Sequence, residues 1–140
     1  MNGKILHPGD DLRDPLDIRY QVFTKEQGFS DPDWDKFDPI SYHVLLCENE
    51  KPVATGRVYR SEDGVFVLGR IAVLKEWRGH SLGRAVIEEL EKIAQADHAK
   101  YLELGAQLYA VPFYQKCGFH PTGNRYMDEF CEHEMMGKNL

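Results

Sequence analysis

The sequence is short of cysteine, of basic residues and of long apolar runs, and each shortage excludes a class of protein. Its three cysteines, Cys47, Cys117 and Cys131, form no Cys-x-x-Cys pair, so neither a disulfide framework nor a zinc knuckle is indicated. Acidic residues outnumber basic ones by 23 to 17, which disfavours nonspecific binding to nucleic acid. No apolar run reaches membrane-spanning length, and residues 1–8 contain no apolar leader segment. We therefore expect a cytoplasmic protein that binds neither a membrane nor nucleic acid.

The length and the hydrophobic content suit one domain. The 140 residues are 42% hydrophobic, which is enough to bury one core, and we expect residues 1–140 to form a single domain. The segment Cys131-Glu132-His133-Glu134 has metal-binding residue types, but a strand would send neighbouring side chains to opposite faces. We expect no metal site.

The pattern of apolar residues predicts a mixed sheet of the α/β (α+β) class. A helix is expected over residues 15–27 and ends at Gly28, and an acidic segment with prolines follows over 30–39. That segment could line an acceptor pocket or be a solvated connection anchored by Trp34 and Phe37. Three apolar runs joined by short turns then predict an antiparallel meander of strands 42–47, 53–60 and 65–73.

The second half predicts a parallel unit. The amphipathic run 82–96 is a helix by its 3.6-residue period, and it lies between the strands 65–73 and 101–106. A strand, a helix and a strand of these lengths form a parallel βαβ unit. A short helix over 112–116 and a closing hairpin over 119–136 complete the expected sheet.

The connection between strand 65–73 and helix 82–96 predicts a phosphate-binding turn. It reads Arg-Gly-His-Ser-Leu-Gly-Arg from Arg78 to Arg84. A helix start leaves N–H groups unpaired and carries partial positive charge, and small residues let a phosphate approach them. The spacing fits neither the P-loop nor the dinucleotide fingerprint. The alternative is a tight connection that binds nothing.

Three segments together resemble one family, the GNAT superfamily of N-acyltransferases. The turn resembles its acyl-coenzyme-A signature, Arg/Gln-x-x-Gly-x-Gly/Ala, with Ser81 in place of the middle glycine. A serine at a position that needs a positive φ would be strained. Residues 107–119 resemble the family's Asn-x-x-Ala-x-x-Phe-Tyr-x-x-x-Gly-Phe, with Gln107 in place of Asn. Residues 19–29, with Phe37-Asp38 and His43, resemble the ElaA-like branch.

The resemblance implies a GNAT-like fold and acetyl-CoA as the co-substrate. It implies that pantetheine lies along the end of strand 65–73 and that the two parallel strands splay apart to admit the thioester. The cofactor-binding residues implied in this way are Ile71, Ala72, Val73, Arg78, Gly79, His80, Ser81, Leu82, Gly83, Arg84, Gln107 and Tyr114.

Two residues are predicted to be catalytic. Tyr114 matches the family tyrosine near the sulfur, and a phenol is protonated at neutral pH, so it can donate a proton to the thiolate. The alternative for Tyr114 is packing. Glu103 is the predicted base, because burial beside the splay would raise its pKa. Glu26, His43 and a chain of waters are the alternatives.

The predicted function is direct transfer of an acetyl group from acetyl-CoA to a primary amine of a small molecule. Arg57, Arg60 and Arg70 could bind an anionic part of the acceptor or pair with acids, and the acidic segment suits a cationic acceptor. Two alternatives remain: a CoA-binding regulatory module, and an acetyltransferase acting on protein lysines or N-termini. Exposed strand edges would allow a homodimer.

Overall fold

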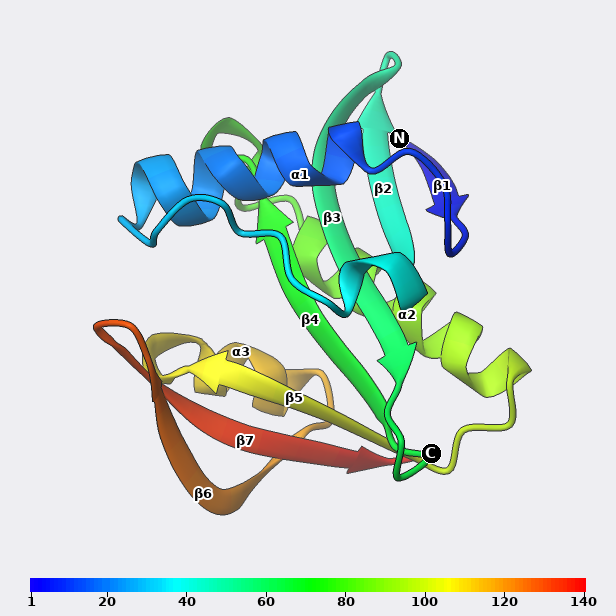
Figure 1. The fold of residues 1–140 in the computed structure, drawn as a ribbon, viewed down its shortest axis with the longest axis vertical. Coiled ribbons are helices and arrows are strands. Elements are labelled where there is room, and N and C mark those ends of the chain that lie inside the picture. The colour runs from blue at the N-terminus through cyan, green and yellow to red at the C-terminus, as the bar shows by residue number, and fades with distance from the viewer.

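One seven-stranded mixed sheet runs through the molecule (Figure 1). The computed structural model describes residues 1–140. The strands are β1 (Asn2–Leu6), β2 (Tyr42–Glu48), β3 (Lys51–Arg60), β4 (Phe66–Val73), β5 (Tyr101–Gln107), β6 (His120–Asp128) and β7 (Cys131–Asn139). Their order across the sheet is β1-β2-β3-β4-β5-β7-β6, and only β4 and β5 are parallel neighbours.

Helices cover both faces of this sheet. They are α1 (Arg13–Arg19), which continues as the π-helix η1 (Tyr20–Glu26), then α2 (Leu82–Ala96) and α3 (Val111–Lys116). Single 3₁₀ turns are η2 (Asp38–Ile40), η3 (Lys75–Trp77) and η4 (Leu108–Ala110). In Figure 1, α1 crosses in front of β2, β3 and β4, whereas α2 and α3 lie behind the sheet.

Burial along the strands follows this layering. Five consecutive residues of β2 and six of β3 are buried, as expected for strands covered on both faces. Helix α2 packs closely on β3 because Gly56 has no side chain: a Cβ there would lie 2.6 Å from Cγ1 of Val86. In contrast, β5 alternates, with Leu102, Leu104 and Ala106 buried and the residues between them half-buried. One face of β5 is therefore left open for a site.

The predicted meander, the parallel βαβ unit and the closing hairpin are confirmed. The first helix begins at Arg13, two residues before the predicted start, and Gly28 follows its end with a φ of +87°. Strand β1 was not predicted. Its side chains are mostly exposed, so it carries no apolar pattern and forms through backbone pairing with β2.

The parallel strands β4 and β5 diverge. They pair only at Phe66 with Leu102 and at Val67 with Glu103, and Figure 1 shows the two arrows moving apart beyond that point. The predicted splay is thus present. None of the helices is both long and apolar enough to cross a membrane.

Candidate active site

A cavity of about 790 Å³ occupies the space between the diverging strands. Its walls come from the π-helix, the segment 29–35, β3, β4, the start of α2, β5, α3 and the hairpin β6–β7. Ten of the twelve residues predicted to bind the cofactor line it: Ile71, Ala72, Val73, Arg78, Gly79, Ser81, Leu82, Gly83, Gln107 and Tyr114. The fold therefore brings the two sequence motifs to one place.

The predicted phosphate-binding turn forms one end of the cavity. Gly79 has a φ of +86°, and Ser81, the residue before α2, has a φ of +60°. A Cβ added to Gly79 would meet nothing within 4 Å, so the space above this backbone is open. Ser81 makes no side-chain cap, which leaves the first N–H groups of α2 available to an anion. The positive φ at Ser81 is the strain that the sequence predicted.

Two predicted cofactor ligands do not line the cavity itself. His80 and Arg84 line an adjoining groove of about 710 Å³ between α2 and β1, which shares Ser81 and Leu82 with the cavity, and the Arg84 guanidinium is 3.3 Å from the carboxylate of Glu88. Successive helical residues rotate by about 100°, so Arg84 projects to a different side of α2 from Gly83. Gly83 itself faces Phe113, whose ring would be 3.2 Å from an added Cβ.

Arg78 is held at the rim of the cavity by Glu26. One guanidinium nitrogen donates to Oε1 of Glu26 at 2.7 Å, a second bonds the other carboxylate oxygen, and Nε donates to the carbonyl oxygen of Val73 at 3.1 Å. The hydrogen bond from Arg78 lowers the pKa of Glu26. The Arg78 side chain is still 42% exposed, so it can reach an anion at the cavity mouth.

The cavity wall on β4 contains a bulge. Thr55 pairs with Ala72 and Arg57 pairs with Gly69, so two residues of β4, Arg70 and Ile71, lie opposite a single residue of β3. Arg70 takes a φ of +51° there. A bulge bends a strand and redirects its side chains. It thus helps to separate β4 from β5 and turns Arg70 toward the cavity.

Gln107 is the last residue of β5, and Tyr114 lies on α3, which follows it. Tyr114 is half-buried between Phe113 and Phe119, at ring separations of 5.1 and 6.2 Å. Burial raises the pKa of its phenol above the usual value, which keeps the hydroxyl protonated. The amide of Gln107 donates to Oε1 of Gln27 at 2.8 Å. Gln27, from the end of the π-helix, was not among the predicted ligands.

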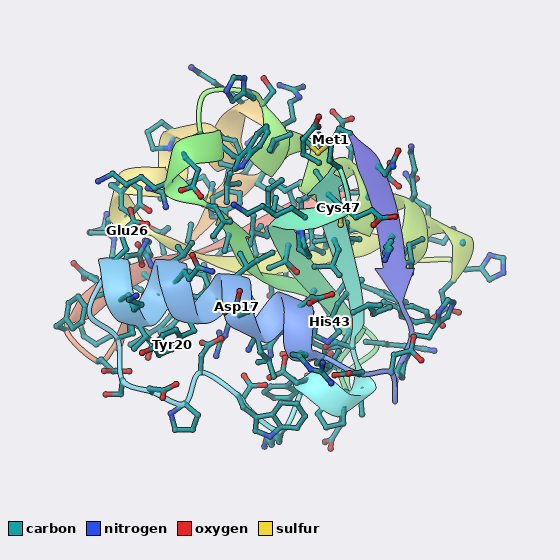
Figure 2. All side chains as sticks on the ribbon, turned by 90° about the horizontal axis from the view of Figure 1, so that it is seen from above. Met1, Asp17, Tyr20, Glu26, His43 and Cys47 are labelled. Atoms are coloured by element: carbon teal, nitrogen blue, oxygen red, sulfur yellow. The ribbon has the colours of Figure 1, made fainter.

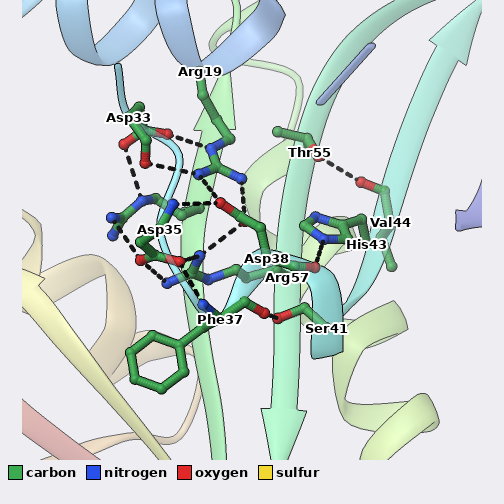
Figure 3. A network of polar contacts seen from close by, with 11 residues as sticks. Arg19, Asp33, Asp35, Phe37, Asp38, Ser41, His43, Val44, Thr55 and Arg57 are labelled. Carbon is green, nitrogen blue, oxygen red and sulfur yellow. Dashed lines mark hydrogen bonds and ion pairs between the residues drawn. The ribbon is translucent and has the colours of Figure 1, made fainter. Parts of the chain in front are cut away.

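The acidic segment is neutralised by buried arginines, as Figure 3 shows. Asp38, at 1% exposure, accepts from Arg19 at 2.7 Å and from Arg57 at 2.9 Å. Arg57 also bonds both oxygens of Asp35, at 2.7 and 2.8 Å.

The same network extends to the cavity wall. Nε of Arg70 lies 3.0 Å from the carboxylate of Asp33, which Arg19 also contacts, and Arg70 donates to Asp35 at 3.1 Å. Three aspartates thus meet three arginines. These three acids are therefore already paired within the protein, and Arg57 and Arg70 pair with acids of the segment 30–39 and not across the strands.

The network fixes the segment over the cavity. Burial alone would raise the pKa of Asp38, but hydrogen bonds from Arg19 and from the Asp35 N–H, together with both arginine charges, lower it well below its usual range. Phe37 stacks on Tyr59 at 4.5 Å, so one of the two aromatic residues considered as anchors does anchor the segment. Trp34 is 47% exposed and lines the cavity, as in the alternative in which the segment lines a pocket.

The residues considered as bases are not gathered at the cavity. Glu103 pairs with Val67 where the strands part, but it is not among the cavity-lining residues. Glu26 is bound to Arg78, and His43 is buried with its Nε2 3.2 Å from the carbonyl oxygen of Asp38. Figure 2 shows Glu26 and His43 near opposite ends of the helical segment α1–η1.

Three aromatic residues on the open face were missed by the sequence analysis. Tyr59, Tyr126 and His133 line the cavity, and they come from β3, β6 and β7. Tyr126 stacks on His133 at 5.1 Å. The alternation used to reject a metal site at residues 131–134 could have revealed His133, because it sends His133 to the face opposite Glu132 and Glu134. No group of three or more His, Cys, Asp or Glu is placed to hold a metal ion.

Comparison with known proteins gives consistent matches along the chain. Residues 25–140 match the family described as an acetyltransferase (GNAT) domain. YjcF of Bacillus subtilis strain 168, an uncharacterized N-acetyltransferase, is 35% identical over 99% of this chain and 100% of its own. ElaA of Escherichia coli K12 is 31% identical over 89% of this chain and 85% of its own.

Solved structures share the fold. The crystal structure of Escherichia coli ElaA matches with a TM-score of 0.87 at 29% identity, over 99% of both chains. A GNAT family acetyltransferase from Elizabethkingia anophelis with acetyl-CoA bound matches with a TM-score of 0.75 over 99% of this chain and 97% of that one. Its identity is 15%, so it resembles this chain in fold alone.

Proposed function

Because this chain belongs to the GNAT family of acetyltransferases, we propose that it transfers the acetyl group of acetyl-CoA directly to a primary amine of a small molecule. The enzyme is an acyltransferase by family. One observation carries the finer proposal: a single cavity connects the turn at the start of α2, the gap between β4 and β5, and Tyr114. Donor and acceptor can therefore meet without a covalent enzyme intermediate.

The residues fit acetyl-CoA. The turn with Gly79 and Ser81 offers backbone N–H groups to the pyrophosphate, and Arg78 adds formal charge. Beyond Val67, β4 has no partner strand on the β5 side, so its backbone at Ile71 and Val73 can pair with the pantetheine arm. The thioester would then enter the gap between the strands, as the resemblance implies.

Tyr114 is the proposed proton donor to the departing thiolate. Its phenol lines the cavity, and burial raises its pKa, so it holds its proton at neutral pH. Gln107 and Gln27 both line the cavity and bond one another. They are proposed to orient the pantetheine amides, since an amide both donates and accepts.

The segment that covers one side of the cavity limits the size of the acceptor. The segment 30–39 is fixed over β3 and β4 by the arginine–aspartate network. This cover favours a small amine over a folded protein surface. The three cysteines are free, which supports the proposed cytoplasmic location. The exposed edge strand β6 is where a homodimer would pair.

A calorimetric titration with acetyl-CoA, followed by an amine screen, tests the proposal. One acetyl-CoA should bind per chain and raise the melting temperature. Release of free CoA thiol should then depend on a small amine, from a panel of polyamines, aminosugars and amino acid amides. Peptides with a free lysine or N-terminus form the comparison arm. Transfer to peptides alone would overturn the small-molecule acceptor, and CoA release independent of any amine would overturn the transfer.

A further inference from the structure

His133 lines the cavity at the open face of the sheet. Strand β7 lies between β5 and β6, and His133 is opposite both Gln107 of β5 and Tyr126 of β6. Gln107 is the last residue of β5, from which the chain leads through η4 to the helix that carries Tyr114. His133 and Tyr114, the proposed proton donor, both line this cavity.

Hydrogen bonding fixes which ring nitrogen of His133 carries the proton. Nδ1 lies 3.1 Å from the carbonyl oxygen of Cys131. A carbonyl oxygen can only accept, so Nδ1 must be the N–H donor. In a neutral ring this leaves the lone pair on Nε2. Nε2 forms no hydrogen bond within the protein, and it is not one of the buried side-chain atoms that lack a partner. Its lone pair is therefore accessible from the cavity.

Packing holds the ring in place. The residue is 7% exposed, and Tyr126 stacks on it with an angle of 19° between the rings. Its neighbour Glu134 projects to the other face of the sheet, where it pairs with Arg125 at 3.1 Å. A buried, oriented imidazole with one free nitrogen has the form that a proton acceptor requires.

We infer that His133 is the general base for the acceptor, taking a proton from its ammonium group at Nε2; the inference rests on the proposed amine transfer. The freed nitrogen lone pair attacks the thioester carbon, a C–N bond forms, and the C–S bond breaks with its electron pair on sulfur. Across the reaction the nitrogen loses two protons, the first to Nε2 of His133 and the second to solvent after the C–N bond has formed, and the sulfur gains one from Tyr114. His133 and Tyr114 return to their starting states by exchange with solvent, and one proton is released in total.

The titratable groups that line the cavity with His133 come from several elements. They include Tyr126 and Asp128 on β6, Glu129 in the turn before β7, Arg70 on β4, and Asp33 and Asp35 of the segment 30–39. Burial raises the pKa of Tyr126, so its phenol remains neutral. Cys131 on β7 is also near, with a thiol pKa raised by burial. On β5, the neighbours Gly105 and Gln107 carry no charge.

The test compares wild type with His133→Gln, which keeps a polar side chain but does not exchange protons near neutral pH. With saturating acetyl-CoA and an alkylamine from the screen, kcat at neutral pH should fall about a hundredfold or more. It should recover as the pH rises and the free amine accumulates. With the alkoxyamine analogue of that acceptor, which is uncharged at neutral pH, wild type and variant should react at nearly equal rates.

A matched control is His120→Gln, because His120 is an exposed histidine on the same hairpin and outside the cavity. It should keep wild-type rates and pH dependence. An equal loss with alkylamine and alkoxyamine in His133→Gln would overturn the proposal, because a packing role affects both acceptors alike. Wild-type kinetics in His133→Gln would also overturn it. The failure of amine transfer itself would be seen earlier, as a wild type that binds acetyl-CoA and acetylates no amine.

A second measurement needs no variant at His133. Long-range ¹H–¹⁵N correlation spectra of the wild type distinguish the two neutral tautomers of each histidine. The His133 signals are assigned through the chemical shifts of the bonded carbons and protons. We expect the Nδ1–H form for this residue. The Nε2–H form as the main tautomer would overturn the proposal, because the cavity-facing nitrogen would then carry a proton and no lone pair.

Discussion

The phenol oxygen of Tyr126 lies directly above the backbone of Gly105. A Cβ at Gly105 would come within 1.9 Å of that oxygen, far inside contact distance. Tyr126 also stacks on His133. The absence of a side chain at Gly105 therefore allows the position of the Tyr126 ring and, through it, supports the position of His133. Glycine is required here for close approach, not for backbone conformation.

Replacement of Gly105 by alanine is therefore expected to displace Tyr126. Tyr126 is 42% exposed and can rotate outward. The free energy of unfolding should therefore fall by only about 1 kcal/mol. Turnover should fall more, because His133 loses its stacking partner. Denaturant unfolding and steady-state kinetics measure the two effects. In a Tyr126→Ala background the added methyl group should cost no further stability, and a cost there would contradict the proposed clash.

Ser81 should tolerate glycine better than any larger residue. Its φ of +60° is unfavourable for a residue with a Cβ by about 1 kcal/mol, which glycine avoids at some entropic cost. Ser81→Gly should keep or slightly raise the stability and leave CoA affinity unchanged. Ser81→Val should lower both, because a β-branched residue disfavours this conformation. Urea unfolding and calorimetry check this, and a stable Val variant with full affinity would contradict it.

Arg78 should be shared between Glu26 and the cofactor. Arg78→Gln should weaken CoA binding about tenfold, or about 1.4 kcal/mol, because a charged contact to the pyrophosphate is lost. Glu26→Gln should strengthen binding, since it releases the guanidinium from its bidentate partner. Lys92→Gln, on the exposed side of α2, is the matched control for a lost positive charge. Unchanged affinity in both rim variants would place the pyrophosphate elsewhere.

Asp38 should make stability depend on acid pH. Its pKa is lowered in the folded state, so its contribution is present above the unfolded pKa of about 3.9 and is lost as the pH falls toward the folded value. Asp38→Asn removes the carboxylate that Arg19 and Arg57 share and leaves them only their contacts with Asp33 and Asp35, so it should cost about 1.5–3 kcal/mol at neutral pH.

The cost of Asp38→Asn should shrink as the wild type is acidified. Chemical unfolding at a series of pH values gives the comparison. Asp63→Asn, in the exposed turn between β3 and β4, should behave as wild type. A pH-independent difference between Asp38→Asn and wild type would show that the carboxylate charge is not the cause.

Tyr114→Phe should reduce turnover roughly tenfold to thousandfold while changing CoA affinity little. The substitution keeps the ring against Phe113 and Phe119 and removes only the hydroxyl. Because burial raises the phenol pKa above about 10, loss of this proton should affect the rate only in strongly alkaline solution. If the rate of both wild type and variant declines at a less alkaline pH, the decline is due to the titration of another group. Full activity in the variant would assign Tyr114 to packing.

The sequence by itself determined the strands β2 to β7, the helices and the place of the glycine-containing turn before α2. These depend on local patterns: apolar periodicity predicts β4, α2 and β5, and small residues beside two arginines mark the turn. Strand β1 had no such pattern, because an exposed edge strand is held by backbone bonds that any side chain permits. The motif order also determined the family, which the comparisons confirm.

Only the tertiary structure decided which side chains meet. Asp33, Asp35 and Asp38 read as a negative surface in the sequence, but Arg19, Arg57 and Arg70 reach them from three other elements. His133 reads as one polar residue among several, and its value as a base depends on the Cys131 carbonyl, the Tyr126 ring and the bare backbone of Gly105. Charge pairing and ring stacking act over a few ångströms in space, and the sequence does not encode such distances between segments that are far apart along the chain.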